Sequence, residues 1–210
     1  MFKKYWKFFV IFWSVVLVGI IGVFVFFWLI SAGKLGFMPT FEELENPNNR
    51  FASEVYFADG PIMNRYFEKE NRKYIEYREI PQSVIDALIA TEDVRFYDHS
   101  GVDVRGLFRV AKGLLTANTS AGGGSTISQQ LAKMLFPRES DLNVFELAIR
   151  KFREWVIAVR LEKSYTKEEI LTMYLNKYDF LNLAVGISSA ADIYFQVPLD
   201  SLKVEQAAML

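Results

Sequence analysis

An uninterrupted apolar segment near the N-terminus constrains this chain more than any other feature of its sequence. The segment, FFVIFWSVVLVGIIGVFVFFWLI, occupies residues 8–30 and holds 23 residues without a charge. At about 1.5 Å per residue, a helix of this length crosses the hydrocarbon core of a bilayer. Three lysines precede it in residues 1–7, and the positive-inside rule places such a tail in the cytoplasm. We therefore predict a transmembrane signal anchor at 8–30, with the remainder of the chain outside the cytoplasm.

A cleaved signal peptide is the alternative interpretation of this segment. The small residues Ser31, Ala32 and Gly33 follow it and would suit a signal peptidase. However, the apolar run is longer than the roughly 7–15 residues of a usual signal-peptide core. Its length favours an anchor that stays in the mature protein.

Composition limits the remaining possibilities. The chain of 210 residues has room for one domain beyond the anchor. From Glu42 onward it has 20 basic and 25 acidic residues, so a basic surface for nucleic acid is not indicated. The absence of cysteine excludes disulfides and cysteine-based zinc sites. With a single histidine, any metal site would consist mostly of carboxylates.

Residues 31–80 are predicted to form a linker and a small β-containing stalk. The part from 34 to 52 is polar and contains two prolines. Asp59-Gly60 then separates two runs rich in Val, Tyr, Ile and Phe, which is the signature of a short β-hairpin. The next segment, ENRKYIEYREI (70–80), is expected to add another strand.

From residue 81 onward the spacing of apolar residues is typical of helices. Apolar stripes run through PQSVIDALIATED (81–93) and DVRGLFRVAKGLL (103–115). The glycine-rich segment TANTSAGGGS (116–125) is predicted to be a loop. After it, we expect Ser125 to cap a helix that ends at Leu135.

Three further helical stretches follow. Asp141 is expected to cap a long helix that ends near Glu162, and Thr166 with Glu169 forms the capping box of another. Shorter helices are predicted at 183–195 and 201–210. The fold class is therefore mainly α.

The stretch TEDVRFYDHSGVD (91–103) gathers acidic residues and the only histidine at the end of the first predicted helix. Glu92 falls at the C-terminal end of that helix, where the helix dipole is negative, and Asp93 adds a like charge. Both effects disfavour ionisation of the Glu92 carboxyl group, which suits a group that transfers protons. The alternative is an acidic helix end that runs into a solvated loop. Phe96 and His99 favour a packed turn instead.

Four segments in order support the proton-transfer interpretation. They are ATEDVRFYDHSGVD (90–103), GGSTISQQLAK (123–133), RKFREWVIAVRLEKSYTKEEILTMYLN (150–176) and AVGISSAADIYF (184–195). Together they closely resemble the peptidoglycan glycosyltransferase domain (glycosyltransferase family 51) of class A penicillin-binding proteins and monofunctional transglycosylases. The resemblance covers about residues 81–210. It implies a lysozyme-like, mainly α domain outside a bacterial cytoplasmic membrane.

The resemblance also implies a reaction. Such enzymes polymerise lipid II into β-1,4 glycan strands, with inversion and release of undecaprenyl pyrophosphate. By the match to the first motif, Glu92 is the general base for the acceptor hydroxyl group, and Glu154 in the third motif is the second functional carboxylate. The cations Lys133, Arg150 and Lys151 position and stabilise the donor pyrophosphate. A surface salt bridge is the alternative for Arg150 and Glu154, which lie four residues apart on one helical face.

Other residues of the motifs take supporting roles by the same resemblance. Substrate binding is expected of four polar residues in the second motif: Ser125, Thr126, Gln129 and Gln130. Structural support of the site is expected of Asp93, Phe96, His99, Glu162 and Asn176. No tightly bound cofactor is expected. Family members are often aided by magnesium or manganese, which Glu154 would suit, although the sequence has no dedicated metal site.

Several positions depart from the family pattern. Leu181 follows Phe180 where an aromatic–glycine pair is common, and Asp192 stands where the family has arginine. Gln196 and Val197 replace a usual glycine–lysine pair. These changes fall in the fourth motif, so altered substrate affinity is expected, while both carboxylates are retained.

The organisation and partners follow from the same resemblance. The chain stops within what resembles the fifth motif, so we expect the domain at 81–210 to be truncated and a C-terminal transpeptidase domain to be absent from this chain. The expected partners are lipid II, the lipid-linked glycan chain, the membrane and cell-wall synthesis proteins. Two rival functions stay open: a lysozyme-like glycan hydrolase, which the cation-rich third motif disfavours, and a non-catalytic membrane-anchored scaffold of the cell-wall machinery.

Overall fold

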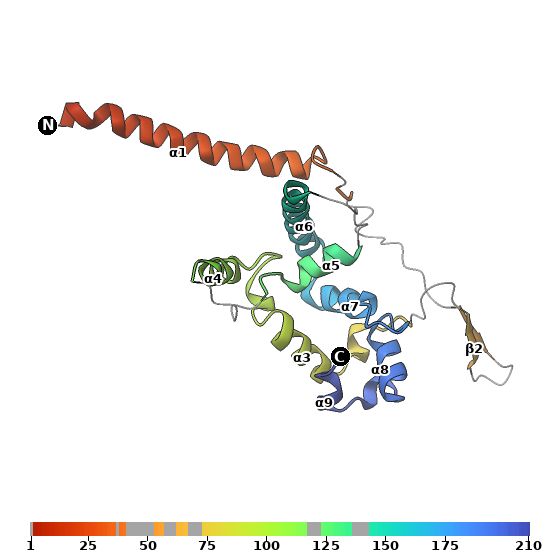
Figure 1. The fold of residues 1–210 in the computed structure, drawn as a ribbon. Helices are drawn as coiled ribbons and strands as arrows, with labels where there is room; N and C mark the ends of the chain where they lie inside the picture. The colour runs from red at the N-terminus through yellow and green to blue at the C-terminus, as the bar shows by residue number, and fades with distance from the viewer. Residues whose placement is uncertain are drawn as a thin grey trace.

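The computed structural model describes residues 2–36, 38–40, 53–56, 62–66, 73–116, 123–135 and 143–210. The helices are α1 (Phe2–Ser31), α3 (Gln82–Glu92), α4 (Val104–Leu115), α5 (Ile127–Leu135), α6 (Val144–Ser164), α7 (Lys167–Lys177), α8 (Ile187–Phe195) and α9 (Val204–Ala207). Short 3₁₀ turns η1 (Tyr77–Glu79), η2 (Phe96–Asp98) and η4 (Leu199–Ser201) and strands β1 (Ser53–Tyr56) and β2 (Ile62–Tyr66) complete the described elements. The mainly α fold that the sequence predicts is confirmed (Figure 1).

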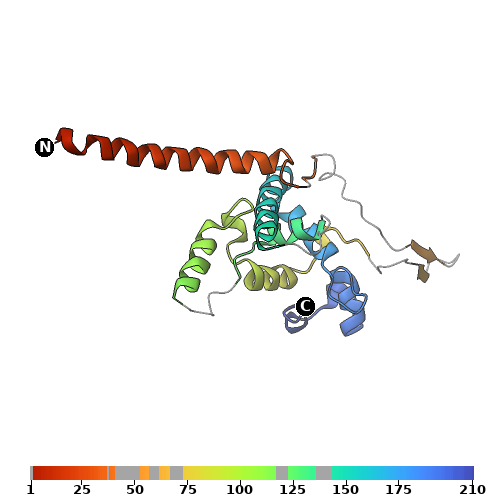
Figure 2. The same cartoon turned by 45° about the horizontal axis from the view of Figure 1, so that its top comes forward.

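The first helix stands apart from the other helices. It projects away from them in both views, and its C-terminal end lies at one end of α6 (Figures 1 and 2). The segment Tyr5–Ser31 has a mean hydropathy of 2.8, and its most apolar window is 0% buried. By length and composition, α1 can therefore cross a membrane.

The junction between α1 and α6 combines apolar and polar contacts. The ring of Phe152 on α6 packs edge-on against Phe26 and Phe27, with ring centroids 5.3 and 5.7 Å apart. Arg160, two turns further along α6, donates a hydrogen bond of 2.8 Å to the carbonyl oxygen of Ser31. It donates another of 3.0 Å to the carbonyl oxygen of Pro39. These contacts fix the end of α1 to the helical domain.

The two strands form a small antiparallel sheet. Ser53 lies opposite Tyr66, so the hairpin that the sequence predicts is confirmed. Its predicted turn, Asp59-Gly60, lies outside the described residues.

The additional strand predicted at 70–80 is wrong for residues 73–80, the part of this segment that the structure describes. Residues 73–76 have no regular structure, and Tyr77–Glu79 form the turn η1. The side chain of Asn176 on α7 explains the difference, because its Oδ1 accepts a hydrogen bond of 3.0 Å from the N–H of Ile75 and its Nδ2 donates one of 2.8 Å to the Ile75 carbonyl oxygen. Both backbone groups that a strand would offer to a neighbour are therefore occupied.

The core of the helical domain forms around α5, which packs against both α6 and α7. Ile127 and Leu131, four residues apart on α5, are both 0% exposed. Large aliphatic residues from the surrounding helices complete the core: Val84, Ile85, Ile157, Leu161, Ile170, Leu171, Leu175 and Ile187. Burial of each such side chain contributes about 1.5–3 kcal/mol. The core thus holds α5, which carries the second motif, at the centre of the domain.

The helix caps follow the sequence closely but not residue for residue. The capping box of Thr166 and Glu169 is confirmed, with a hydrogen bond of 2.7 Å from the Thr166 N–H to Glu169 Oε2. The long helix α6 is capped by Asn143, whose Oδ1 accepts from the N–H of Glu146 at 3.0 Å. The predicted cap, Asp141, lies outside the described residues.

The cap of α5 is one residue later than predicted. Thr126, and not Ser125, directly precedes the helix, and its Oγ1 accepts a hydrogen bond of 3.2 Å from the N–H of Gln129. The hydroxyl group of Ser125 points elsewhere, to Lys151. Because of this shift, the Thr126 hydroxyl group caps the helix and the Ser125 hydroxyl group does not.

Left-handed backbone conformations border α8 on both sides. Leu181, Asn182 and Leu183 have φ angles of 69°, 50° and 67°. This turn delays the predicted helix, which begins at Ile187 instead of residue 183. Gln196, just after the helix, has a φ of 57°. Leu181 and Gln196 are thus non-glycine residues in a conformation that favours glycine.

We expect the substitution Gln196→Gly to stabilise the protein by about 0.5–1 kcal/mol. The left-handed conformation costs a side-chain-bearing residue roughly 1–2 kcal/mol, and the greater freedom of glycine in the unfolded chain offsets part of this gain. The Gln196 side chain is exposed, so its removal loses little packing. Chemical unfolding would measure the change. The same substitution at Gln82, in the first turn of α3, should destabilise instead; stabilisation at both positions, or at neither, would contradict the argument.

Candidate active site

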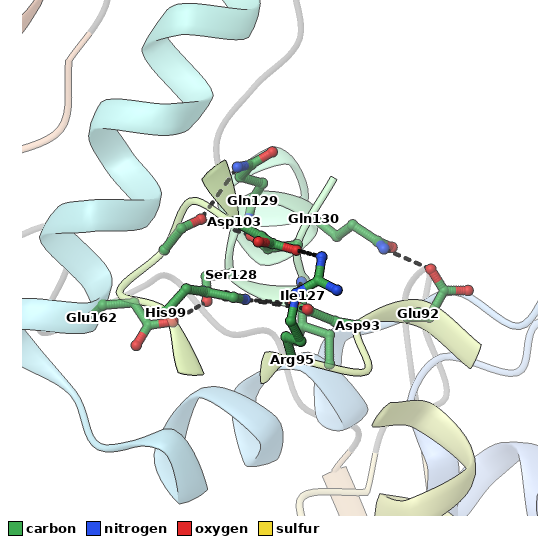
Figure 3. Close-up of polar contacts among 12 residues, drawn as sticks. Glu92, Asp93, Arg95, His99, Asp103, Ile127, Ser128, Gln129, Gln130 and Glu162 are labelled. Atoms are coloured by element: carbon green, nitrogen blue, oxygen red, sulfur yellow. Dashed lines mark hydrogen bonds and ion pairs between the residues drawn. The ribbon is translucent and has the colours of Figure 1, made fainter. Parts of the chain in front are cut away.

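Glu92 is the last residue of α3, as the sequence predicts, and its side chain is exposed. The buried residues Val84 and Ile85 hold the other end of α3 in the core. One carboxylate oxygen of Glu92, Oε2, accepts a hydrogen bond of 2.7 Å from Nε2 of Gln130 on α5 (Figure 3). The second motif therefore contacts the first through this pair.

Gln130 in turn contacts Tyr174 on α7. The hydroxyl group of Tyr174 donates a hydrogen bond of 3.1 Å to Gln130 Oε1. Burial, followed by the negative charge of Glu92, raises the pKa of Tyr174, so the hydroxyl group keeps its proton. The sequence pattern assigned Gln130 to the substrate, whereas the structure gives both ends of its amide a protein partner. Tyr174 was not among the predicted site residues.

Asp93 and His99 hold the turn that follows Glu92. The Asp93 carboxylate accepts a hydrogen bond of 3.1 Å from the N–H of Ile127, at the start of α5. Nε2 of His99 lies 3.0 Å from Asp93 Oδ2 (Figure 3). Phe96, in the same turn, is 0% exposed, and the ammonium group of Lys167 lies 4.2 Å from the centre of its ring. The turn is therefore packed rather than solvated.

Gly101 lets the turn approach α6 closely. Its φ is 93°, and a Cβ atom there would lie 2.8 Å from the backbone of Ala158, so only glycine fits. Its carbonyl oxygen accepts hydrogen bonds from Oγ1 of Thr126 at 2.7 Å and from Nε2 of Gln129 at 3.2 Å. Thr126 and Gln129, which the sequence assigned to substrate binding, are consequently 2% and 1% exposed. In this structure both side chains donate hydrogen bonds to the turn instead of facing a ligand.

Glu162 joins three elements beneath the site. Its Oε1 accepts a hydrogen bond of 2.5 Å from Oγ of Ser128 on α5. It also accepts one of 2.8 Å from Nζ of Lys167, which in turn donates to the carbonyl oxygen of His99 at 2.7 Å. These contacts tie α5, α6 and the start of α7 to the turn after Glu92.

Lys151 connects the third motif with the second. Its Nζ donates a hydrogen bond of 3.0 Å to Oγ of Ser125 and one of 2.9 Å to Oε2 of Glu154. The partner of Glu154 is thus Lys151, three residues away, and the described contacts do not include the alternative salt bridge with Arg150. The Arg150 side chain is half-buried on α6, and that of Lys133 is exposed in the last turn of α5.

Two cavities meet at Glu92. A polar cavity of about 520 Å³ is lined by Thr91, Glu92, Asp93, Val94, Arg95, Asp103, Gly106, Arg109, Gly123, Gly124, Ser125, Thr126 and Gln130. A smaller, more apolar cavity of about 200 Å³ is lined by Glu92 and Thr91 together with residues of α3, α7, α8 and the C-terminal segment. Glu92 therefore borders both cavities. Ser125, which accepts the hydrogen bond from Lys151, lines the polar one.

The polar cavity contains an ion pair that the motif analysis did not single out. Arg95 donates a hydrogen bond to Oδ2 of Asp103, the residue before α4 (Figure 3). Burial works against ionisation of Asp103, but the hydrogen bonds from Arg95 and from the backbone of Gly106 together hold the pKa of Asp103 below its ordinary value of 3.8. A Cβ atom at position 106 would lie 2.5 Å from Asp103 Oδ2, so this close contact requires glycine there. Gly106 is therefore the feature of the sequence that could have pointed to this arrangement.

We expect Asp103→Asn to lower the free energy of unfolding at pH 7 by about 1–2 kcal/mol. Asparagine can still cap α4, so the substitution removes mainly the charge. Because the folded-state pKa is lowered, the carboxylate stabilises the fold above its unfolded pKa and loses that effect as the pH falls through the folded value. Urea unfolding from pH 7 to about pH 3 should therefore show the two proteins converge in acid. An equal gap at every pH would refute this origin of the difference.

The described residues do not provide a metal cage. No group of three or more His, Cys, Asp or Glu side chains is suitably placed within the described ranges. Glu154, the residue expected to suit a divalent cation, is 12% exposed and bound to the ammonium group of Lys151.

Comparison with known proteins agrees with this architecture. The family model described as transglycosylase matches residues 59–210. The chain is 37% identical to penicillin-binding protein 1A of Escherichia coli over 173 residues and 37% identical to that of Pseudomonas aeruginosa, covering 82% of this chain and 20% of each relative. The protein of the same name from Neisseria lactamica is 36% identical, over 82% of this chain and 21% of its own length. The chain spans about a fifth of the length of these relatives. It belongs to the transglycosylase family.

Proposed function

We propose that this chain is a membrane-anchored peptidoglycan glycosyltransferase that polymerises lipid II. In this proposal α1 spans the cytoplasmic membrane of a bacterium, with the lysines of residues 1–7 on the cytoplasmic side. The helical domain then lies outside, where the lipid-linked substrates are accessible. Membership of the transglycosylase family, and the similarity to proteins named as penicillin-binding proteins, support this assignment.

The position of Glu92 carries the proposal. Its exposed carboxylate stands where the two cavities meet, held by Gln130 at 2.7 Å. A transfer between two sugars needs a base that reaches the space between two bound substrates. Ser125, which accepts a hydrogen bond from Lys151, lines the polar cavity. A base that lines the cavity and a cation bound to Ser125 suit an attacking hydroxyl group and a leaving pyrophosphate.

The proposed reaction is a single displacement. The 4-hydroxyl group of the acceptor sugar attacks the anomeric carbon of the lipid-linked chain and passes its proton to Glu92. The bond between that carbon and the pyrophosphate oxygen breaks, and the electron pair leaves with the oxygen. Lys151, with support from Arg150 and Lys133, stabilises the charge that develops there. Glu154 fixes the Lys151 ammonium group from the opposite side at 2.9 Å.

A glycan hydrolase that used Glu92 as its base would need a carboxylic acid nearby to protonate a sugar oxygen. The two acidic residues that line the polar cavity with Glu92 are poorly suited to that role. Asp103 is paired with Arg95 and has a lowered pKa, and Asp93 is buried against His99 and the start of α5. A pyrophosphate leaving group needs no such acid.

No step of this reaction is routed through a metal ion. The described residues around Glu154 do not form a three-ligand site, and Lys151 occupies its carboxylate. A cation that binds with the substrate would have to take most of its ligands from pyrophosphate oxygens and water.

Incubation of the full chain with labelled lipid II in detergent tests the proposal. A polymerase should convert the substrate into a ladder of glycan strands and release undecaprenyl pyrophosphate. A hydrolase should instead shorten purified glycan strands and leave lipid II untouched. A scaffold should do neither, and either of these outcomes would overturn the assignment.

A further inference from the structure

A chain of hydrogen bonds links the buried interior of the domain to the exposed carboxylate of Glu92. It begins at the hydroxyl group of Tyr174, passes through the amide of Gln130 over 3.1 Å, and ends at Glu92 Oε2 over 2.7 Å. The three residues come from three helices: α7, α5 and α3. Figure 3 shows the last link, where the amide of Gln130 points at the Glu92 carboxylate.

The chemistry of the three groups allows only one orientation of the amide. A carboxylate accepts hydrogen bonds and cannot donate them, so Gln130 must turn its NH₂ group toward Glu92. Its carbonyl oxygen then faces Tyr174, whose hydroxyl group can donate. With the amide flipped, two acceptors would face each other at Glu92. By donating to this oxygen, the Tyr174 hydroxyl group stabilises the amide orientation that binds the carboxylate.

We propose that Tyr174 is a positioning residue that, through Gln130, holds the carboxylate of Glu92 in place for proton transfer. This inference rests on the function proposed above, in which Glu92 is the base. It gives a role to a residue of the third segment (150–176) that was not among the predicted site residues.

Glu92 needs such help because its own helix does little to fix its side chain. It is the last residue of α3, exposed, and followed by Asp93 with a φ of −157°, where the helix has already ended. An exposed glutamate at a helix end samples several rotamers, and each one moves the carboxylate away from a bound hydroxyl group. Proton transfer requires a heavy-atom separation of about 2.6–3.2 Å. A fixed donor on α5 removes most of that freedom.

Tyr174 suits the task because its own position is well determined. The residue is 3% exposed, and its ring stacks on that of Tyr178 at 5.4 Å with an interplanar angle of 23°. It is carried by α7, which packs against α5. The raised pKa of Tyr174 keeps the hydroxyl group protonated through the neutral range, so the donor persists.

The decisive variant is Tyr174→Phe in the full chain, which removes the hydroxyl group and keeps the stacked ring. We expect kcat for polymerisation of lipid II to fall about tenfold with little change in KM. Tyr5→Phe is the control. It removes an exposed hydroxyl group from α1, at a residue that lines neither cavity, and should behave as wild type.

A double-mutant cycle separates positioning from a general loss of stability. Gln130→Leu should reduce kcat at least as much as Tyr174→Phe, and the two changes together should cost no more than Gln130→Leu alone. The thermal midpoint of each variant measures any loss of fold. A wild-type kcat in Tyr174→Phe, or a full additional tenfold loss in the Gln130→Leu background, would overturn the inference.

The variant Glu92→Gln distinguishes a failure of this inference from a failure of the proposed function. If Glu92→Gln polymerises as well as wild type, Glu92 is not the base and the proposed function fails in its central residue. If Glu92→Gln is inactive while Tyr174→Phe matches wild type in kcat, the base stands and only the role of Tyr174 is refuted.

Discussion

Glu92→Gln is expected to reduce the rate of glycan polymerisation by about 10²–10⁴-fold, the usual contribution of a general base. Glutamine has the shape of glutamate but cannot accept the proton of the attacking hydroxyl group. Its amide oxygen can still accept the hydrogen bond from Gln130, so the turn and both cavities should keep their form. Single-turnover assays with labelled lipid II, with glycan products resolved by length, would measure the loss.

A matched control variant tests whether a loss of activity comes only from a change in fold or net charge. Glu168 is an exposed residue in the first turn of α7 and lines neither cavity. The substitution Glu168→Gln removes the same charge as Glu92→Gln. That variant should polymerise as wild type does. If both variants lose activity equally, a change in fold or net charge is responsible, and unfolding curves would reveal it. If neither loses activity, the base lies elsewhere.

Lys151→Met should lower kcat by about 10²–10³-fold, because it removes a cation aimed at the charge of the leaving pyrophosphate. Methionine keeps much of the length and apolar character of the stem. The substitution also leaves Glu154 without the ammonium group that lies 2.9 Å away. The resulting unpaired carboxylate would repel the pyrophosphate, so binding of the donor should weaken as well. Single-turnover rates at increasing substrate concentration would separate the two effects.

Lys163→Met is the natural comparison for this variant. Lys163 is exposed in the last turn of the same helix, and its loss changes net charge by the same amount. Activity should be unaffected. The double variant Lys151→Met with Glu154→Gln adds a second check, since removal of the unpaired carboxylate should restore part of the donor affinity. No recovery, or an equal loss in Lys163→Met, would argue against direct stabilisation of the leaving group.

Local features of this chain could be read from its sequence because nearby residues determine them. The capping box of Thr166 and Glu169 and the end of α3 at Glu92 are examples, since caps and helix dipoles act over a few residues. The position of Glu92 as a candidate site residue followed from its place at a helix end together with the family resemblance.

Contacts between distant segments could not be read in the same way. Gln130 and Tyr174 lie 44 positions apart, and only the packing of α5 on α7 brings their side chains together. The strand predicted at 70–80 failed for a similar reason, because Asn176, 101 positions from Ile75, takes the hydrogen bonds that a strand would use. The ion-pair partner of Glu154 is Lys151, where the sequence offered Arg150 as an alternative. Spacings of three and four residues both suit a helical ion pair. The observed pair has a spacing of three, and the same Lys151 ammonium group also donates a hydrogen bond to Ser125 on another segment.

The junction of α1 with α6 has a consequence for how this protein would search for substrate. Phe152 and Arg160 fasten the end of α1 to the helix that also carries Lys151 and Glu154. With α1 across a bilayer, the catalytic groups would lose the freedom to rise, sink or tilt independently of it. Lateral diffusion and rotation about the membrane normal would then be the main rigid-body motions left. A lipid-borne sugar, confined in the same way by its own tail, would meet the cleft at a constant height.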